Sequence, residues 1–447
     1  MKVLVFHGYM LRGTGSNIYN VNLARALARL GHEVHLLCQD REVRIEGVRI
    51  HNPDIGGLLP VYVKDPYEGF EVKTFPELTE AELDRYLEAN VAAVREVAAA
   101  AGGIDLALAN HLVMGPAILA RAAVAPFAVK VHGSALEYTV KPHPRFLPYA
   151  REGVEAANGV LTGSGHTAAS LWAALADLPE LREKTRLGPP GVDVEEFRPR
   201  GWREPLVAFV GKLIVSKGVD LLLAAWPLVR ASNPRARLEV AGYGAFEDGL
   251  QQLLAALEEG DLGEARGIAR RGWSLEGGEE RPLPILSAFL ADPPEGYAEM
   301  ARAAAGSVEL IGRLEHHEVA SFFSRSEAMV MPSTFPEAFG MVAVEAAACG
   351  ALPVSAGHSG MLEVSRQLSD ALSEPVGRLV SFPVEEGAVE AIAERLNGWF
   401  ALPENRRDAA RGALVETVSR LWSWEGVAGG VLAAAAGELD DLPRATG

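Results

Sequence analysis

Short, fully apolar runs alternate along this chain with longer stretches of helical periodicity. Residues 3–6 form such a run, and residues 18–30 follow with apolar side chains at helical spacing. Gly31 stands where a helix commonly ends, and residues 33–37 form the next apolar run. Strands of a parallel sheet are buried on both faces, and a strand–helix–strand unit joins them. The alternation therefore predicts a parallel α/β sheet.

The alternation occurs twice, with an interruption rich in proline and glycine at residues 188–205. Strands are expected at residues 104–109, 128–131 and 159–162 in the first series and at 206–210, 236–241, 308–311, 328–332 and 352–355 in the second. Helices are expected at residues 80–101 and 148–158, and then at 221–231, 319–324 and 341–349. We therefore predict two Rossmann-like domains, residues 1–199 and 200–420.

Three segments depart from this regular pattern. Residues 41–79 contain repeated glycine and proline and are expected to be irregular, and a connection of that length is often functional. Residues 245–307 are long for one crossover, which indicates an inserted helical or mobile segment. Residues 421–447 are expected to be mostly helical, with no strand after them.

Composition excludes several classes of protein. Lys plus Arg number 42 against 59 Asp plus Glu, a net charge of −17, which disfavours non-specific binding to nucleic acid or anionic membranes. Cys38 and Cys349 lie too far apart for a disulfide framework or a zinc set and fit a cytoplasmic location. We find no apolar stretch long enough for a signal peptide or a transmembrane helix.

The sharpest local motif lies at residues 332–345, where a strand is expected to end and a helix to begin near Gly340. The free backbone N–H groups of Gly340, Met341 and Val342 would form an anion site suited to a diphosphate. Glu337 and Glu345 flank that helix start and could accept hydrogen bonds from sugar and ribose hydroxyls. The simpler alternative is that both glutamates are solvated charges.

A second motif follows the first strand of the second series. Lys212 and Lys217 stand in a glycine-containing loop at the carboxyl end of that strand, where they could hold phosphates. Their charge would stabilise a departing diphosphate. The alternative is two ordinary surface lysines.

The first series offers weaker signals. Gly13-Thr14-Gly15-Ser16 could let a ligand approach the backbone or simply make a turn. His111 and His132 follow expected strands, at the sheet edge where ligands bind in open α/β sheets. A single histidine is more often structural. The chain contains no metal-ligand spacing, phosphate-loop signature or serine nucleophile turn that we recognise.

In this order, the motifs resemble those of the retaining glycosyltransferases of family 4, over nearly the whole chain. Besides the two glutamates and two lysines, the resemblance is carried by Gly13-Thr14-Gly15-Ser16, Leu30-Gly31-His32-Glu33-Val34, Asn110-His111, Val131-His132-Gly133-Ser134, Pro190-Gly191-Val192-Asp193 and residues 357–363. The family has the GT-B architecture, with two Rossmann-like domains facing across a cleft. It implies that the last helix packs back onto the first domain. Lys212 departs from the common arginine and lacks its bidentate fork.

The resemblance implies transfer of a sugar from a nucleotide-diphosphate sugar to an acceptor hydroxyl with retention of configuration. The donor would be a UDP, GDP or ADP sugar, and no cofactor or metal would be essential. The acceptor is not identified, and a homo-oligomer stays open. The family's reaction is a front-side attack through an oxocarbenium-like state, assisted by the diphosphate.

By the same resemblance, the donor lies mainly on the second domain. Glu345 would hold the ribose, and Glu337 the sugar hydroxyls. Lys212, Lys217 and the amides of Gly340, Met341 and Val342 would hold the diphosphate, which Gly15 completes from the first domain. His111 would orient the sugar or acceptor, with His132 and Ser134 as further contacts. The expected catalytic residues are Glu337, His111 and Lys217.

Three other functions stay open. An NAD-dependent dehydrogenase is suggested by the early glycine loop and by Asp40, which could bind a ribose near the end of the second strand. The chain could be a non-catalytic sugar-nucleotide-binding protein of the same fold. A phosphorylase or epimerase also stays open, because fold does not fix reaction.

Overall fold

The computed structural model describes residues 1–13, 15–64 and 67–445. It divides into two compact units: Met1–Gly191 with the chain from Trp422 onward, and Val192–Leu421. The sequence predicts a boundary after residue 199, whereas the contacts place it after Gly191. The reason is that Phe197 already packs against His316 of the second unit, with ring centroids 4.9 Å apart.

A seven-stranded sheet forms the core of unit 1, and every neighbouring pair in it is parallel. In spatial order its strands are β3 (Val48–His51), β2 (Glu33–Leu37), β1 (Lys2–Phe6), β6 (Leu106–Asn110), β7 (Phe127–Val131), β8 (Gly159–Thr162) and β9 (Thr185–Leu187). The interior strands are buried along almost their whole length, which explains their continuous apolar runs.

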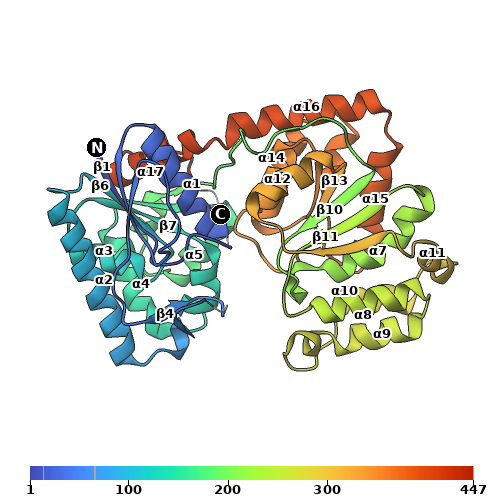
Figure 1. The fold of residues 1–447 in the computed structure, drawn as a ribbon, viewed down its shortest axis with the longest axis horizontal. Coiled ribbons are helices and arrows are strands. Elements are labelled where there is room, and N and C mark those ends of the chain that lie inside the picture. The colour runs from blue at the N-terminus through green and yellow to red at the C-terminus, as the bar shows by residue number, and fades with distance from the viewer. Residues whose placement is uncertain (14, 65–66, 446–447) are drawn as a thin grey trace. The chain divides into compact units, whose positions relative to one another are not determined.

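Helices cover both faces of this sheet (Figure 1). One face carries α2 (Glu80–Ala100), α3 (Gly115–Ala122) and α4 (Leu147–Ala156), and the other carries α1 (Gly15–Arg29) and α17 (Trp424–Ala436). The last of these, α17, packs against α1, β6, β7 and β8. The remaining helices of the unit are η1 (Phe75–Glu77), η2 (Ala135–Val140), η3 (Pro144–Phe146), α5 (Gly165–Ala174) and α6 (Glu180–Lys184).

Residues 41–79 are more regular than the sequence indicates. β3 joins the edge of the main sheet, and β4 (Leu58–Val61) and β5 (Glu71–Thr74) form a separate two-stranded parallel sheet. The expectation of an irregular segment is therefore wrong for these strands. They are four residues long, and β3 and β5 are half-exposed and carry charged side chains. β3 and β5 therefore lack the apolar run that marks an interior strand, and in β4 the run is interrupted by Pro60.

Unit 2 is built on a six-stranded sheet whose neighbouring pairs are also all parallel. In spatial order its strands are β12 (Val308–Gly312), β11 (Arg237–Ala241), β10 (Leu206–Val210), β13 (Ala328–Met331), β14 (Leu352–Ala356) and β15 (Ser381–Phe382). The expected fold class, two doubly wound parallel-sheet α/β domains, is confirmed.

The helices of unit 2 form two packed groups. In the first, α7 (Val219–Ser232) contacts α11 (Tyr297–Ala303) and α15 (Ala388–Ala401). In the second, α13 (Met341–Ala348) contacts α12 (His316–Arg325), α14 (Ser359–Asp370) and α16 (Glu404–Leu421). The unit also contains the 3-10 turns η4 (Val215–Lys217) and η6 (Val376–Val380).

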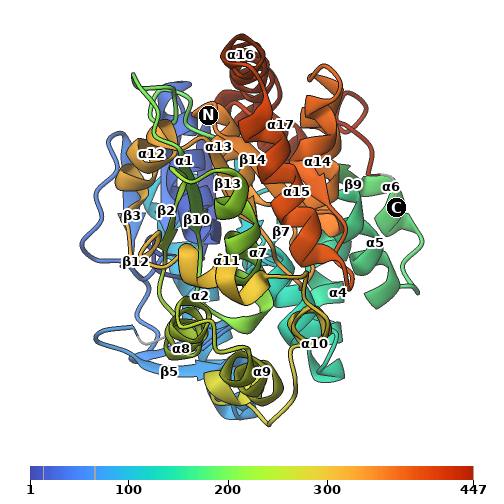
Figure 2. The same ribbon diagram turned by 90° about the vertical axis from the view of Figure 1, so that its right-hand side faces the viewer.

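The segment 245–307 is largely helical. It contains α8 (Glu247–Glu258), α9 (Leu262–Arg271), the turn η5 (Trp273–Glu276) and α10 (Pro284–Ala291), and ends with α11. Figures 1 and 2 show α8, α9 and α10 gathered together, and both α8 and α10 contact α9 and α7. The segment therefore extends the α7 side of the unit.

Each sheet has one point at which its strand order reverses. In unit 1, β1 lies between β2 and β6, and in unit 2, β10 lies between β11 and β13. At such a switch point, the loops leaving the carboxyl ends of two adjacent strands run in opposite directions and leave room for a ligand. The loops after β1 and β6, and after β10 and β13, are therefore where a site is expected.

Candidate functional site

Most of the residues predicted from the sequence lie on these loops or in the helices that follow them, whereas His132 and Ser134 follow β7. They divide between the two units. Gly15, His111, His132 and Ser134 lie in unit 1, and the two lysines, the two glutamates and the start of α13 lie in unit 2. Each unit is described here by itself.

In unit 2, the lysine loop and the glutamate loop meet. Lys217, at the end of η4, forms an ion pair with Oε1 of Glu337, which lies in the loop after β13. Ser333 Oγ donates to the same carboxylate oxygen at 2.9 Å. About a quarter of each side chain of the pair is exposed, 26% for Lys217 and 23% for Glu337, so both can reach a ligand. The pairing places a cation and an anion at the β10–β13 switch point.

A hydrogen-bonded chain fixes the backbone around Glu337. His358 Nε2 lies 2.8 Å from the carbonyl oxygen of Ser333, so that nitrogen carries the proton. The other ring nitrogen, Nδ1, then accepts from the hydroxyl of Ser359 at 3.1 Å. The Ser359 oxygen in turn accepts the backbone N–H of Glu337 at 3.0 Å. The glutamate is therefore held through its backbone as well as its side chain.

The start of α13 lies just beyond Glu337. Gly340 precedes the helix with φ of 97°, a conformation that favours glycine, and Met341 and Val342 open it half-exposed. The first N–H groups of a helix have no partner within the helix and lie at its positive end. This end of α13 can therefore accept an anion beside Lys217 and Glu337.

Glu345 lies one turn further along α13 and is almost fully buried. His316, the first residue of α12, has Nε2 3.0 Å from Glu345 Oε1. Burial lowers the pKa of His316, but the hydrogen bond to Glu345 and the charges of Glu345, Glu196 and Asp193 together outweigh it and leave that pKa raised. The sequence does not suggest this partner. It holds the Glu345 carboxylate in one orientation.

Close packing shapes the loop that carries Lys212 and Lys217. Gly218 has φ of 67°, and a Cβ there would overlap the carbonyl oxygen of Pro332. Thr334 N–H donates to the carbonyl of Ser216 at 2.9 Å, which ties the two loops together again. Lys212 is half-buried and is the second residue after β10. The loop thus has little freedom to move away from the glutamate loop.

In unit 1, His111 is a buried residue whose imidazole ring makes no hydrogen bond to the residues that the structure describes. It is 2% exposed, and both of its ring nitrogens lack a partner there. Its φ is 67°, which costs a non-glycine residue about 1–3 kcal/mol. Burial holds the pKa of His111 well below its usual value, so the imidazole is neutral. A strained, neutral imidazole with two unused nitrogens is suited to hydrogen-bonding a hydroxyl.

A chain of polar side chains runs beside His111. His132 Nε2–H donates to Asn110 Oδ1 at 2.9 Å, and Asn110 Nδ2 donates to Asn20 Oδ1 at 2.7 Å. Asn20 Nδ2 then donates to His7 Nδ1 at 3.0 Å. Burial lowers the pKa of His7 to about 4 and that of His132 well below its usual value. The ring centroids of His132 and His111 are 4.8 Å apart, so the chain supports one side of His111.

The other two predicted residues of unit 1 have less distinctive surroundings. Gly15 is the first residue of α1, and Thr14 before it lies outside the described residues. Ser134 precedes η2 and makes no side-chain capping bond to it. Neither residue is joined to His111 by a contact that we can name.

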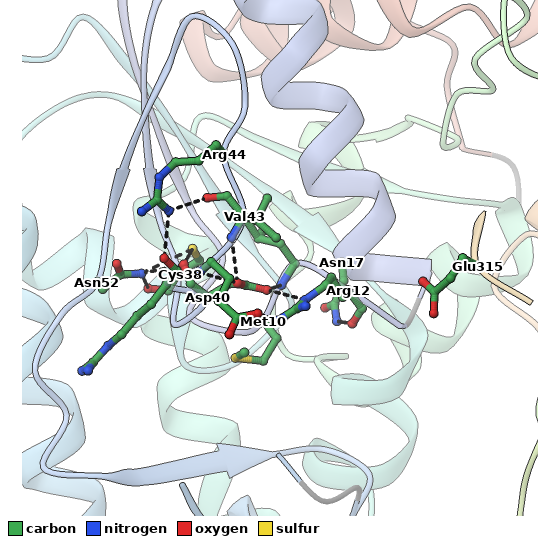
Figure 3. A network of polar contacts seen from close by, with 12 residues as sticks. Met10, Arg12, Asn17, Cys38, Asp40, Val43, Arg44, Asn52 and Glu315 are labelled. Atoms are coloured by element: carbon green, nitrogen blue, oxygen red, sulfur yellow. Dashed lines mark hydrogen bonds and ion pairs between the residues drawn. The ribbon is translucent and has the colours of Figure 1, made fainter. Parts of the chain in front are cut away.

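Asp40 has a structural role, which removes the main support for a dehydrogenase (Figure 3). Its Oδ1 accepts the backbone N–H groups of Glu42 and Val43, both at 3.1 Å. Its Oδ2 accepts the N–H of Leu11 at 3.3 Å and Arg12 Nε at 3.2 Å. A carboxylate offers about four acceptor positions. Those of Asp40 are therefore occupied by its own unit, and none is left for a ribose.

The residues that the sequence reasoning missed share one signal. His7 follows β1 directly, His358 follows β14 by two residues, and His316 follows β12 by four. The rule that selected His111 and His132, a position just beyond a strand's carboxyl end, selects these three as well. Applying it to every strand would have found them.

Among the residues that the structure describes, no helix combines the length and the apolar character that crossing a membrane requires. In the same ranges, no three His, Cys, Asp or Glu side chains gather as a metal site would need.

The fold of the two units, each built on a doubly wound parallel sheet, is that of the GT-B class of α/β proteins. Sucrose-phosphate synthase from Thermosynechococcus elongatus superposes with a TM-score of 0.62 at 20% identity, covering 96% of each chain. HepE of Anabaena, solved in complex with UDP-glucose, superposes with a TM-score of 0.60 at 14% identity, covering 98% of this chain and 99% of HepE. At such identities the likeness shows the fold alone.

Comparison of the sequence with family models identifies the family within this class. Residues 13–196 match the model of Glycosyltransferase Family 4, and residues 299–414 match that of Glycosyl transferases group 1. The chain therefore belongs to the glycosyltransferases of family 4, as the resemblance indicated.

Curated relatives match over different lengths. D-inositol 3-phosphate glycosyltransferase of Frankia alni is 28% identical, with 94% of this chain and 93% of the relative covered. The enzyme of that name from Segniliparus rotundus is 28% identical over 56% of this chain and 46% of its own length. A GDP-mannose-dependent mannosyltransferase of Corynebacterium glutamicum, which acts on a phosphatidylinositol monomannoside, is 26% identical over 53% of this chain and 52% of its own. The chain thus spans about half the length of the last two.

Proposed function

We propose that the protein transfers a sugar from a nucleotide-diphosphate sugar to an acceptor hydroxyl with retention of configuration. The observation that carries this proposal is the Lys217–Glu337 ion pair beside the open end of α13, at the β10–β13 switch point. A diphosphate needs cations and free N–H groups, and a sugar needs hydroxyl acceptors. Unit 2 offers both within two adjoining loops.

Each group has a role in this reaction. The diphosphate would compete with Glu337 for Lys217, which frees the carboxylate to accept hydroxyls of the sugar. Lys212, Lys217 and the first N–H groups of α13 would stabilise the charge that grows on the leaving diphosphate. Glu345, oriented by His316, would accept the ribose hydroxyls. His111 would hydrogen-bond the sugar or the acceptor, and Gly15 would admit the diphosphate close to the backbone.

The ligands and names of the relatives indicate which donor bases and which acceptor to test first. HepE was solved with UDP-glucose, and starch synthase IV of Arabidopsis thaliana with ADP and acarbose. A relative matched over nearly its whole length is named for D-inositol 3-phosphate. The Corynebacterium glutamicum relative is named as GDP-mannose-dependent. We therefore propose UDP, ADP and GDP sugars as donors and a phosphorylated polyol as the first acceptor to test.

The first experiment is a thermal-shift panel with UDP, ADP, GDP and NAD(H). Ligands that bind the folded state raise its stability by mass action. We expect one nucleoside diphosphate to raise the melting temperature and NAD(H) to leave it unchanged. A shift with NAD(H) alone would contradict the proposal. The sugar's anomeric configuration, followed by NMR in the transfer product, tests retention, and an inverted product would refute that part.

Glu337→Ala tests the site itself. We expect transfer to fall at least about a hundredfold, because the sugar loses its carboxylate partner, while the fold is kept. Glu386→Ala, at an exposed glutamate of the same unit, is the matched control. Full transfer activity in the Glu337 variant would remove this residue from the site.

A further inference from the structure

A residue of the 245–307 segment reaches the lysine loop. Glu276 ends the turn η5, and its Oε2 accepts the backbone N–H of Val215 at 2.7 Å. Val215 opens η4, the turn that ends at Lys217. Glu276 is half-buried and Val215 is 5% exposed, so the bond is shielded from water. The inserted segment therefore touches the candidate site through one carboxylate.

The rest of the lysine loop is held by backbone bonds. Leu213 N–H donates to the carbonyl of Tyr243 at 2.8 Å, and Phe246 N–H donates to the carbonyl of Leu213 at 2.9 Å. On the far side, Ser216 accepts from Thr334. Between these hydrogen bonds lies the N–H of Val215, the first of η4, which has no carbonyl partner within its own turn. Ile214 before it provides no side-chain cap. Glu276 supplies the missing acceptor.

Glu276 is itself held in place by the turn that carries it. Trp273 N–H donates to the carbonyl of Arg281 at 3.0 Å, and the Arg281 guanidinium lies 4.1 Å from the centroid of the Trp273 ring. A side chain at Gly272 would overlap the Arg281 carbonyl. The turn is thus closed by backbone and ring contacts, and these keep the carboxylate aimed at the lysine loop.

We propose that Glu276 is a positioning residue for diphosphate binding: by accepting the Val215 N–H, it fixes η4 and so the place of the Lys217 ammonium. This inference rests on the proposed function, because it needs a diphosphate for Lys217 to bind. It gives the inserted segment a role, which is to brace the donor site from the α7 side. Glu276 itself touches neither donor nor acceptor.

The size of the effect follows from the geometry. A hydrogen bond to a carboxylate is among the stronger ones, and its loss leaves the Val215 N–H without a partner. Displacement of a binding group by about 1 Å can cost on the order of a hundredfold in rate. We therefore expect Glu276→Ala to lower kcat/KM for the donor by about 10- to 100-fold.

The experiment compares three variants of the full chain with a nucleotide sugar that the wild type uses. Glu276→Ala should show that loss, and Glu276→Gln, which keeps an oxygen acceptor, should stay within about threefold of wild type. Glu279→Ala, at an exposed glutamate of the same segment, should match wild type. The inference is overturned if the alanine variant stays within threefold of wild type, or if the glutamine variant falls as far as the alanine variant.

A double-mutant cycle separates positioning from a merely structural role. If Glu276 acts through Lys217, adding Glu276→Ala to Lys217→Ala should lower kcat/KM by less than threefold more. A full multiplication of the two losses would refute the inference. Should the alanine variant fail to fold, Glu276→Asp replaces it, because the shorter side chain withdraws the carboxylate, and a loss of at least fivefold is expected.

Failure of this inference and failure of the proposed function give different results. If the wild type neither binds nor consumes any nucleotide sugar, the proposed function fails and the inference with it. If the wild type does so and the Glu276 variants behave like the Glu279 control, the inference alone fails.

Discussion

Lys217 and Glu337 come from motifs 120 positions apart and meet at one oxygen atom. Each was predictable as a charged residue in the loop that follows a parallel strand. Their pairing was not, because it depends on how the loops after β10 and β13 fold against one another. The same holds for Glu345 and His316: the helix position of Glu345 follows from the sequence, whereas its partner begins another helix. Motifs thus locate candidate residues, and loop packing decides their partners.

The His316–Glu345 pair gives a pH-dependent contribution to stability. Because the pKa of His316 is raised in the folded protein, its stabilisation is fully present below the pKa of an unfolded histidine and is lost as pH rises through the folded value. We expect His316→Ala to destabilise unit 2 at pH 6 on the order of 1 kcal/mol, about 2–4 °C in Tm. Thermal denaturation at pH 6 and pH 9 measures the difference.

The control is His317→Ala, at the exposed histidine next to it. Its Tm should follow that of the wild type at both pH values. A His316 variant whose deficit grows as pH rises would contradict the sign of the linkage.

At the scale of elements, the interior strands and the edge strand β12 were predictable, whereas the edge strands β3, β9 and β15 were not. The strands β1, β10 and β14 are buried along almost their whole length, so their sequences are mostly apolar. The edge strands β9 and β15 have three and two residues, too few for any periodicity. Burial on both faces gives a strand the continuous apolar run by which it can be recognised in the sequence.

The contact between the lysine loop and β13 can be tested through glycine. Gly218 and Gly201 have similar positive φ values, 67° and 82°, but only at Gly218 would a Cβ meet other atoms. We expect Gly201→Ala to cost about 1 kcal/mol and Gly218→Ala about 1–3 kcal/mol more, because the latter adds overlap to strain. Denaturation in urea measures both variants. Equal losses of unfolding free energy in the two variants would show that the protein relieves the overlap with the Pro332 carbonyl at no cost in stability.

At the scale of the molecule, the strand–helix alternation predicted both sheets, and the family comparisons agree with the resemblance. Which segments of the chain make up each unit was harder to predict from the residues alone. Unit 2 is continuous, whereas unit 1 is completed by α17, which follows unit 2 in the sequence. No local pattern in residues 421–447 states which sheet their helix will cover, because that choice depends on a matching apolar face far away in sequence.

Two tryptophans test whether the units unfold independently. Trp424 is buried in unit 1, and Trp399 is buried in unit 2. Alanine at either position should cost about 3–5 kcal/mol, because each leaves a large cavity. We expect scanning calorimetry to show Trp424→Ala lowering one transition and Trp399→Ala lowering another. If both variants move the same single transition, the two units unfold as one.

The return of α17 also has a consequence for synthesis. A ribosome completes β6, β7 and β8 long before it makes the helix that packs on them, and the whole of unit 2 is translated in between. Until then, the nascent sheet carries an apolar face that only part of its final cover can protect. Domains ordinarily fold in the order in which they emerge. In this chain the unit that begins first is finished last, so the interval in which a chaperone or a neighbouring chain can bind that face is set by the length of unit 2.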